Sequence, residues 1–245
     1  MRTLLLVLAG LVCLSGVRLA TAQSWDISDL KVAKAEDKVD VKVVPPPKGA
    51  VVLFDGKDLD AWAKADDGKS KPTWKLVKGD AVQVHGGNIV TRRKFDRHFK
   101  LHVEFRVPYM PDKKSQERGN SGVYVQGRYE VQVLDSYQNE TYEKGECGAI
   151  YEVSAPSVNA CKAPTIWQSY DIEFRAPGCE DGKKTEPARI TVYQNGIKIQ
   201  DNVKITTDNT RAGLGGDVCQ PGPIMLQDHG APVQYRNIWL LPLES

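Results

Sequence analysis

The stretch Phe99-Lys-Leu-His-Val-Glu-Phe-Arg-Val107 decides the class of fold. Phe, Leu and Val alternate strictly with Lys, His, Glu and Arg, which gives the segment one apolar and one polar face with a period of two. This pattern is typical of an antiparallel β-strand that packs against a core with one face only. The polar face carries His102, Glu104 and Arg106.

The chain after residue 48 has the same character. Short apolar or alternating runs are separated by turn sequences, and Asn195-Gly196 is a strong hairpin signal because both positions need a positive φ. The runs expected as strands are 51–54, 74–77, 81–84, 88–91, 99–107, 123–126, 129–134, 170–175, 189–194, 197–200, 224–227 and 233–241. No long amphipathic helix and no internal repeat interrupts them. We therefore predict an all-β fold, a two-sheet antiparallel β-sandwich, as one domain over residues 49–245.

Residues 1–22 have the form of a secretory signal peptide. A basic start at Arg2 is followed by an apolar run and by the small residues Ala20-Thr21-Ala22. A lipid anchor at Cys13 is the alternative, but the preceding Val12 is a poor fit to the small residue expected there. No later segment approaches the roughly 20 apolar residues of a membrane span. The sequence thus predicts export to the periplasm or beyond.

Residues 23–48 are predicted to form a charged extension outside the domain. They end in Pro45-Pro46-Pro47, which cannot continue a helix or join the centre of a sheet and so indicates a stiff linker. The whole chain has 33 basic and 31 acidic residues, a net charge of +2. Because no basic face with interleaved aromatics stands out, nucleic acid is not expected as a partner. The oligomeric state is left open.

Four cysteines remain after the signal peptide: Cys147, Cys161, Cys179 and Cys219. An even number in an exported chain favours disulfides. Of the three pairings we favour Cys147–Cys161, which closes one loop, and Cys179–Cys219, which ties two loops that flank strands. Metal binding is the competing interpretation, but no Cys-x-x-Cys spacing supports it. No cofactor is expected, with a divalent metal left open.

Two polar segments, residues 119–135 and residues 222–239, contain candidate site residues. In residues 222–239, the trio Gln227, Asp228 and His229 lies between two strand-like runs. Such a trio is poor core material, because each donor and acceptor would need a buried partner, and it suits the rim of a sugar site. In residues 119–135, Asn120 lies in a polar turn before a strand. Its side chain could face sugar hydroxyls, or it could serve only to stabilise the turn.

Carboxylates on strands are the candidate acids and bases. If their strands are neighbours, Glu104 and Glu130 could lie about 5 Å apart, which would raise one pKa and create an acid/base pair. The competing interpretation is a solvated strand face with ordinary Glu–Arg pairing. His229 is either a hydrogen-bonded structural histidine or a group that titrates near neutral pH. The tryptophans are expected mainly in the core, and Trp167 is the exception most expected to serve as a sugar platform.

Several motifs occur in order along the chain: Leu53-Phe-Asp-Gly-Lys-Asp-Leu59 with Trp62, the 99–106 strand, Gly119-Asn-Ser-Gly122, Tyr129-Glu-Val-Gln-Val-Leu-Asp135, Gly148-Ala-Ile-Tyr151, Trp167, the Asn195-Gly196 hairpin and residues 222–238. In number and order they resemble the motifs of the bacterial 3-keto-disaccharide hydrolase domain family, whose fold is a concanavalin A-like jelly roll. The four cysteines and residues 179–187 look like additions to the family pattern.

The resemblance implies cleavage of a 3-keto-glycoside, with a carbohydrate substrate. A base would remove the C2 proton, the C1 substituent would leave by elimination, and water would then add. Our hypothesis assigns the catalytic roles to Glu104, Glu130, Asp228 and His229, with either glutamate as the base and with Asp228 and His229 acting on the leaving group or the enolate. The same hypothesis assigns substrate binding to Arg106, Asn120, Gln126, Gln132, Asp135, Trp167 and Gln227.

Three other functions compete with keto-sugar cleavage. A conventional retaining glycosidase of this fold would carry a Glu-x-Asp-x-x-Glu strand, which the sequence lacks. A non-catalytic carbohydrate-binding module would use the same fold without juxtaposed carboxylates. A structural envelope protein is the third alternative.

Overall fold

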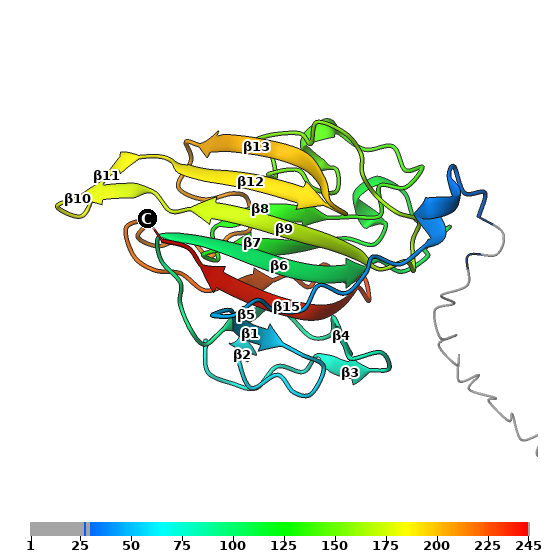
Figure 1. The fold of residues 1–245 in the computed structure, drawn as a ribbon, viewed down its shortest axis with the longest axis horizontal. Helices are drawn as coiled ribbons and strands as arrows, with labels where there is room; N and C mark the ends of the chain where they lie inside the picture. The colour runs from blue at the N-terminus through cyan, green and yellow to red at the C-terminus, as the bar shows by residue number, and fades with distance from the viewer. Residues whose placement is uncertain (1–26, 28–29, 245) are drawn as a thin grey trace, which may run out of the picture.

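The structure, a computed structural model, describes residue 27 and residues 30–244. Two antiparallel sheets pack face to face, and the described helices are three short 3-10 turns (Figure 1). The predicted all-β sandwich is therefore confirmed. None of the described helices is long and apolar enough to cross a membrane. The predicted signal peptide, residues 1–22, lies outside the described residues.

The large sheet has the strand order β13-β12-β9-β6-β15-β4-β3, and β1 pairs with β15 as well. Its strands are β1 (Val51–Phe54), β3 (Lys75–Val77), β4 (Ala81–Gln83), β6 (His98–Arg106), β9 (Gln168–Arg175), β12 (Ala188–Gln194), β13 (Ile197–Ile205) and β15 (Gln234–Pro242). The small sheet has the order β2-β5-β14-β7-β8. Its strands are β2 (Trp62–Lys64), β5 (Ile89–Thr91), β7 (Ser121–Val125), β8 (Tyr129–Val133) and β14 (Met225–Leu226).

The core lies between the sheets and is built by the predicted alternation. Phe99, Leu101, Val103 and Phe105 of β6 point inward and are at most 1% exposed. Val123 and Val131, from β7 and β8, enter the same core from the small sheet. Burial of each such side chain contributes about 1.5–3 kcal/mol. Because side chains alternate, the residues between these apolar ones face outward from each sheet.

The remaining elements are a hairpin and short turns. They are β10 (Gly178–Glu180), β11 (Lys183–Glu186), η1 (Ala35–Lys38), η2 (Ser115–Glu117) and η3 (Glu143–Gly145). The hairpin β10–β11 projects from one end of the large sheet (Figure 1). A disulfide joins Cys179 in β10 to Cys219, as predicted. It ties the hairpin to the loop that precedes β14.

The predicted Cys147–Cys161 bridge is not formed, and both residues are buried free thiols. The Gln194 amide donates to both sulfurs, at 3.5 Å and 3.4 Å. Cys147 also hydrogen-bonds the Tyr170 hydroxyl at 3.0 Å. Each sulfur thus has polar partners in its reduced form, which corrects this half of the predicted pairing.

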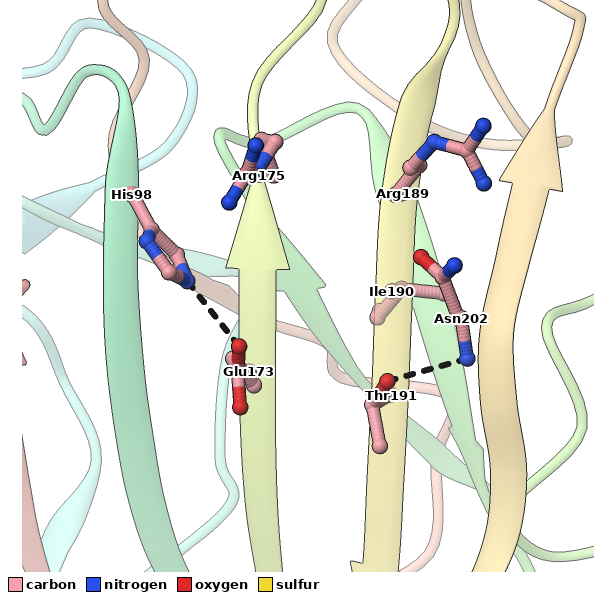
Figure 2. Close-up of a pocket in the computed structure, with 7 residues that line it drawn as sticks. All are labelled: His98, Glu173, Arg175, Arg189, Ile190, Thr191 and Asn202. Carbon is pink, nitrogen blue, oxygen red and sulfur yellow. Dashed lines mark hydrogen bonds and ion pairs between the residues drawn. The ribbon is translucent and has the colours of Figure 1, made fainter. Parts of the chain in front are cut away.

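The outer face of the large sheet is open at one end and covered at the other. At the open end, a shallow hollow of about 260 Å³ lies over β6, β9, β12 and β13 (Figure 2). At the other end, residues 39–47 run across the face, and we call this segment the strap. The backbone N–H of Val41 donates to the backbone oxygen of Trp167 (3.1 Å). The backbone N–H of Trp167 donates in turn to Asp40 Oδ1 (2.9 Å).

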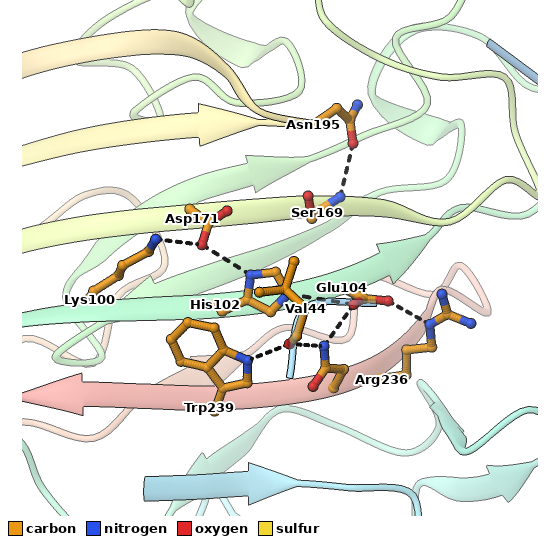
Figure 3. Close-up of polar contacts among 10 residues, drawn as sticks. Val44, Lys100, His102, Glu104, Ser169, Asp171, Asn195, Arg236 and Trp239 are labelled. Carbon is orange, nitrogen blue, oxygen red and sulfur yellow. Dashed lines mark hydrogen bonds and ion pairs between the residues drawn. The ribbon is translucent and has the colours of Figure 1, made fainter. Parts of the chain in front are cut away.

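The strap lies on the sheet and does not project from it as a stiff linker. It also covers the polar face of β6, for which a solvated surface was the competing interpretation. Val44 O accepts hydrogen bonds from Asn237 Nδ2 (2.9 Å) and Trp239 Nε1 (3.1 Å), both from β15 (Figure 3). Beneath it, His102 and Glu104 are completely buried. Alternation identified their face correctly, but it could not show that a distant part of the chain would cover that face.

Candidate functional site

The outer face of the small sheet carries a row of polar side chains. Tyr124 of β7 lies opposite Glu130 of β8, and Gly122 lies opposite Gln132. Met225 of β14 continues the row next to Tyr124. Since Val123 and Val131 point into the core, these residues share the outward face. The local sequence Tyr-Glu-Val-Gln-Val in β8 therefore places one acid and one amide side by side, about 7 Å apart along the strand.

A pocket of about 290 Å³ opens over this row. It is lined by Asn120, Glu130, Gln132, Tyr151, Arg211, Ala212, Gln227 and His229. Five of these residues were predicted as site residues: Asn120, Glu130, Gln132, Gln227 and His229. The structure thus brings together residues from β8, from the turn before β7, and from the segment after β14.

Gly122 makes the central arrangement of the pocket sterically feasible. A Cβ atom at this position would lie 2.5 Å from Glu130 Oε1 and 2.8 Å from Tyr124 Cε2. Both contacts are far below van der Waals distance, so any side chain here would displace the carboxyl group or the ring. Because Gly122 has no side chain, the Glu130 carboxyl group and the Tyr124 ring can both occupy the space above it.

Glu130 is buried without a positive partner. It is 3% exposed, and among the described residues no Lys, Arg or His lies within 4.0 Å of its carboxylate. Burial raises the pKa of Glu130 to about 8, a hydrogen bond from Tyr124 opposes this rise, and the charge of Glu152 adds to it. A strongly perturbed carboxyl group in a pocket is a typical feature of a functional site.

Two amide oxygens in the pocket also lack partners. Gln227 donates its Nε2 to the Tyr124 hydroxyl at 3.0 Å, and Gln132 donates its Nε2 to Gln116 Oε1 at 2.9 Å. The Oε1 atoms of Gln132 and Gln227 are buried and have no hydrogen-bond partner within the described residues. Buried acceptors without partners are costly in a folded protein, so they favour a bound donor such as a sugar hydroxyl.

The rim of the pocket is polar and more exposed. His229 is exposed, and Arg211 forms an ion pair with Glu152 at 3.2 Å. The hydroxyl of Tyr151 hydrogen-bonds that of Tyr142. The pocket therefore combines a buried acid at its base with an exposed imidazole at its mouth.

Three predicted site residues lie near the pocket or at its sheet but do not line it. Asp228 caps turns, accepting from the backbone N–H groups of Gly87 (2.8 Å) and Gly230 (2.9 Å). Gln126, in the β7–β8 turn, donates to Phe95 O and accepts from Arg128. Both side chains are used to hold loops.

Asp135 is likewise outside the pocket. It forms an ion pair with Arg118 at 2.8 Å and accepts from the Tyr137 N–H. Burial raises the pKa of Asp135 to about 6, although Arg118 opposes the rise. Its position at the end of β8 is consistent with anchoring the following loop.

Glu104 and Arg106 belong to β6 of the other sheet, and Figure 3 shows Glu104 close to Val44 of the strap. Trp167 precedes β9 of that sheet and is hydrogen-bonded to the strap at Asp40 and Val41. Glu104 belongs to β6 of the large sheet and Glu130 to β8 of the small sheet, so the proposed Glu104–Glu130 pair is wrong. Trp167 is 4% exposed, and the guanidinium groups of Arg106 and Arg236 stack on its ring at 4.8 Å and 4.2 Å. A ring covered in this way cannot serve as a sugar platform.

The sequence prediction missed Tyr124, Tyr151 and Arg211. Tyr124 could have been found, because the period of two places it on the same face as Gly122 and opposite Glu130. Tyr151 and Arg211 come from loops that reach the pocket only in the folded chain. Within the described residues no group of three His, Cys, Asp or Glu side chains is arranged to hold a metal ion.

A β-sandwich with a pocket of amides and one buried acid is the setting of a carbohydrate-active domain. The family model of the 3-keto-alpha-glucoside-1,2-lyase-like domain matches residues 49–241. The chain belongs to this family, which confirms the resemblance seen in its sequence.

Solved structures give the same result. A protein of Parabacteroides distasonis ATCC 8503, assigned as a glycosyl hydrolase, is 39% identical, with a TM-score of 0.75 over 84% of this chain and 90% of that chain. Two further proteins of that organism with the same assignment share the fold. One is 18% identical, with a TM-score of 0.57 over 80% of this chain and 95% of its own. The other is 21% identical, with a TM-score of 0.52 over 79% and 99%. No curated protein matches the chain.

Proposed function

We propose that the protein cleaves 3-keto-glycosides in the Glu130 pocket, with Glu130 as the general base. The observation that carries this proposal is a buried carboxyl group without a counter-charge, whose pKa is raised to about 8, in a pocket with two unpartnered amide oxygens. The lyase-like description of the family supports the same chemistry.

The substrate chemistry requires a base of this kind. A ketone at C3 of a glycosyl unit acidifies the hydrogen on C2, but the carbon acid remains weak. A carboxylate whose conjugate acid has a pKa of about 8 is a stronger base than an ordinary glutamate and is still half ionised near pH 8. The Tyr124 hydroxyl, hydrogen-bonded to Glu130, stabilises the charged form that removes the proton.

The electrons then move in two steps. The C2–H electron pair forms an enolate with C3, which collapses to a C1=C2 double bond as the C1–O bond breaks and its electron pair leaves on the aglycone oxygen. That oxygen takes a proton, for which His229 at the mouth of the pocket is our candidate donor. Water then adds its hydroxyl to C1 and a proton to C2, so the net reaction is hydrolysis.

The amides hold the sugar in this scheme. The Oε1 atoms of Gln132 and Gln227 accept from sugar hydroxyls, and Asn120 completes the wall beside them. A pocket of about 290 Å³ lies at the small end of ligand sites, which suits one sugar ring inside and the aglycone at the rim.

A conventional retaining mechanism fits the pocket less well. It requires two carboxyl groups about 5–5.5 Å apart on either side of the glycosidic bond. Among the described residues that line the pocket, Glu130 is the one carboxylic acid, and the neighbouring Glu152 is paired with Arg211. A single base with a proton donor is what elimination needs.

The test compares a 3-keto-glucoside with its unoxidised parent, each carrying the same chromogenic aglycone. We expect aglycone release from the keto compound alone, together with exchange of the C2 hydrogen for deuterium in heavy water. Equal release from both compounds would identify a conventional glycosidase. Binding without release from either would identify a carbohydrate-binding module.

A further inference from the structure

A row of basic side chains crosses the outer face of the large sheet at its open end. His98 of β6 lies opposite Arg175 of β9, and Arg175 lies opposite Arg189 of β12. Arg189 in turn lies opposite Lys204 of β13. Their inward neighbours, such as Phe99 and Phe174, are buried in the core, so the four side chains of this basic row share the outer face. Across three strand intervals the row spans about 14 Å.

Three members of the basic row, Arg175, Arg189 and Lys204, have no carboxylate partner within the part of the sheet that the structure describes. Like charges directly opposite one another destabilise an antiparallel pair. Among the described residues no carboxylate lies within 4.0 Å of Arg175, Arg189 or Lys204. The nearby Glu173 is bonded to His98, with 3.0 Å between Oε1 and Nε2. Three adjacent cations on neighbouring strands therefore face solvent with their charge available to a ligand.

The surface is hollowed where the row crosses it. The hollow of about 260 Å³ is lined by His98, Glu173, Arg175, Arg189, Ile190, Thr191 and Asn202 (Figure 2). His98 and Arg175 also line a second hollow, of about 480 Å³, which includes Asp96 and reaches Cys179 and Cys219 of the disulfide. The two hollows share His98 and Arg175, so together they extend beyond the size of a single small anion.

We propose that the basic row binds an anionic polysaccharide, with carboxylate or sulfate groups of one chain pairing with Arg175, Arg189 and Lys204. A guanidinium group presents paired donors that match such groups. The spacing of about 5 Å between strands sets the cations in a line, which suits a chain that bears an acidic group at regular intervals. The basic row lies on the opposite sheet from the Glu130 pocket. The row would therefore bind the polysaccharide at a surface separate from the site of cleavage.

A polysaccharide fits this surface better than a nucleic acid. Proteins that bind single strands combine cations with aromatic side chains on which bases stack. The seven residues lining the hollow include no Phe, Tyr or Trp. They do include Thr191 and Asn202, whose polar side chains match sugar hydroxyls, and the family of the chain is carbohydrate-active.

The experiment measures the binding of polygalacturonate, heparin, neutral dextran, single-stranded DNA and anionic phospholipid vesicles to the full chain. The double variant Arg175→Gln/Arg189→Gln is compared with Lys75→Gln/Lys78→Gln, which removes the same charge from exposed positions near β3. We expect at least one of the two acidic polysaccharides to bind, and the first variant alone to raise its Kd about tenfold or more, with binding weakened between about 50 and 200 mM salt. Polygalacturonate and heparin separate carboxylate from sulfate as the preferred group.

Thermal unfolding provides the second readout. The acidic polysaccharide should raise the Tm of the wild type and of the lysine control but not of the arginine variant, which should itself fold normally because its substitutions relieve repulsion. The proposal is overturned if neither polysaccharide binds, if both double variants lose binding equally, or if DNA or vesicles bind more tightly than either polysaccharide. Release of aglycone from a small keto-glucoside should be the same in both variants, which separates this surface from the pocket.

Discussion

Glu104 and Glu130 occupy comparable positions on the two sheets and have opposite electrostatics. Each lies on the outward face of a strand, and each is at most 3% exposed. Glu104 is bonded to Arg236 Nε and Asn237 Nδ2, both at 2.7 Å, with His102 Nε2 at 3.5 Å. Burial acts to raise the pKa of Glu104, but these partners outweigh it and lower the pKa. Glu130 has no cation, and its pKa rises.

The difference teaches that burial alone does not mark a reactive carboxylate. A buried acid with a full set of partners is held ionised and contributes to structure, whereas a buried acid without them stays neutral near pH 7 and can exchange a proton. The backbone contributes to the first case. A bulge in β15, with Asn237 at φ 45°, turns both Arg236 and Asn237 toward Glu104.

The largest expected effect is on catalysis at Glu130. Glu130→Gln keeps the size of the side chain and removes the base, so turnover of a 3-keto-glucoside should fall about 1,000-fold, equivalent to about 4 kcal/mol. Single-turnover measurement of aglycone release checks this, with the circular dichroism spectrum as the control for folding. If the turnover of the variant stays within tenfold of the wild type, the general base is a residue other than Glu130.

Glu104→Gln should give the reverse result. Replacement of the charge leaves Arg236 without its partner beneath the strap, which should lower the free energy of unfolding by about 3 kcal/mol. Turnover per folded molecule should stay within a factor of three, because Glu104 lies on the other sheet from the pocket. Denaturant unfolding and active-site assays on one preparation give both numbers. A loss of activity as large as that of Glu130→Gln would break the contrast between the two residues.

The sequence was sufficient for the fold because local alternation carries the information. The apolar residues of β6 and β9 that the period of two selected are the ones buried in the core. The same period identified Glu130 and Gln132 as sharing a face. These predictions depend only on residues that are close in the sequence. In a pleated strand the side chains of alternate residues lie on the same face, so the sequence pattern gives their placement directly.

The assignment of residues to one site failed where the order of the strands mattered. Period two gave Glu104 and Glu130 equivalent outward positions, but it could not assign them to different sheets. The strap shows the same limit, because the contacts of Val44 with Trp239 join residues almost 200 positions apart. Trp167 was misjudged for a related reason, since the two arginines that cover it come from different strands.

The pH dependence of stability sharpens the contrast further. Because the pKa of Glu130 is raised to about 8, the folded state holds its proton more tightly than the unfolded state, whose Glu has the ordinary pKa near 4.5. This contribution is complete below pH 4.5 and is lost as pH rises to about 8, at up to about 1.4 kcal/mol per pH unit. Glu130→Gln should remove that slope.

Glu104 should act in the opposite direction. Its lowered pKa means that its contribution is present above the ordinary value and is lost as the pH falls through the folded pKa. Chemical denaturation of the wild type and both Gln variants from about pH 2, below the lowered pKa of Glu104, to about pH 9 gives the two difference curves. Difference curves of the same sign would contradict the electrostatic assignment of one glutamate.

The smallest expected effect is on the attachment of the strap, the segment that covers Glu104. Asp40→Ala removes the acceptor of the Trp167 N–H and should lower stability by about 1 kcal/mol, the usual net contribution of one hydrogen bond. Because Lys42 lies within the strap, trypsin should cleave there faster in this variant. Asp66→Ala, an exposed acid far along the chain from the strap, is the matched control. If cleavage and stability both match the control, the strap is held by its backbone contacts at Val41 and Val44, and the burial of Glu104 does not depend on this side chain.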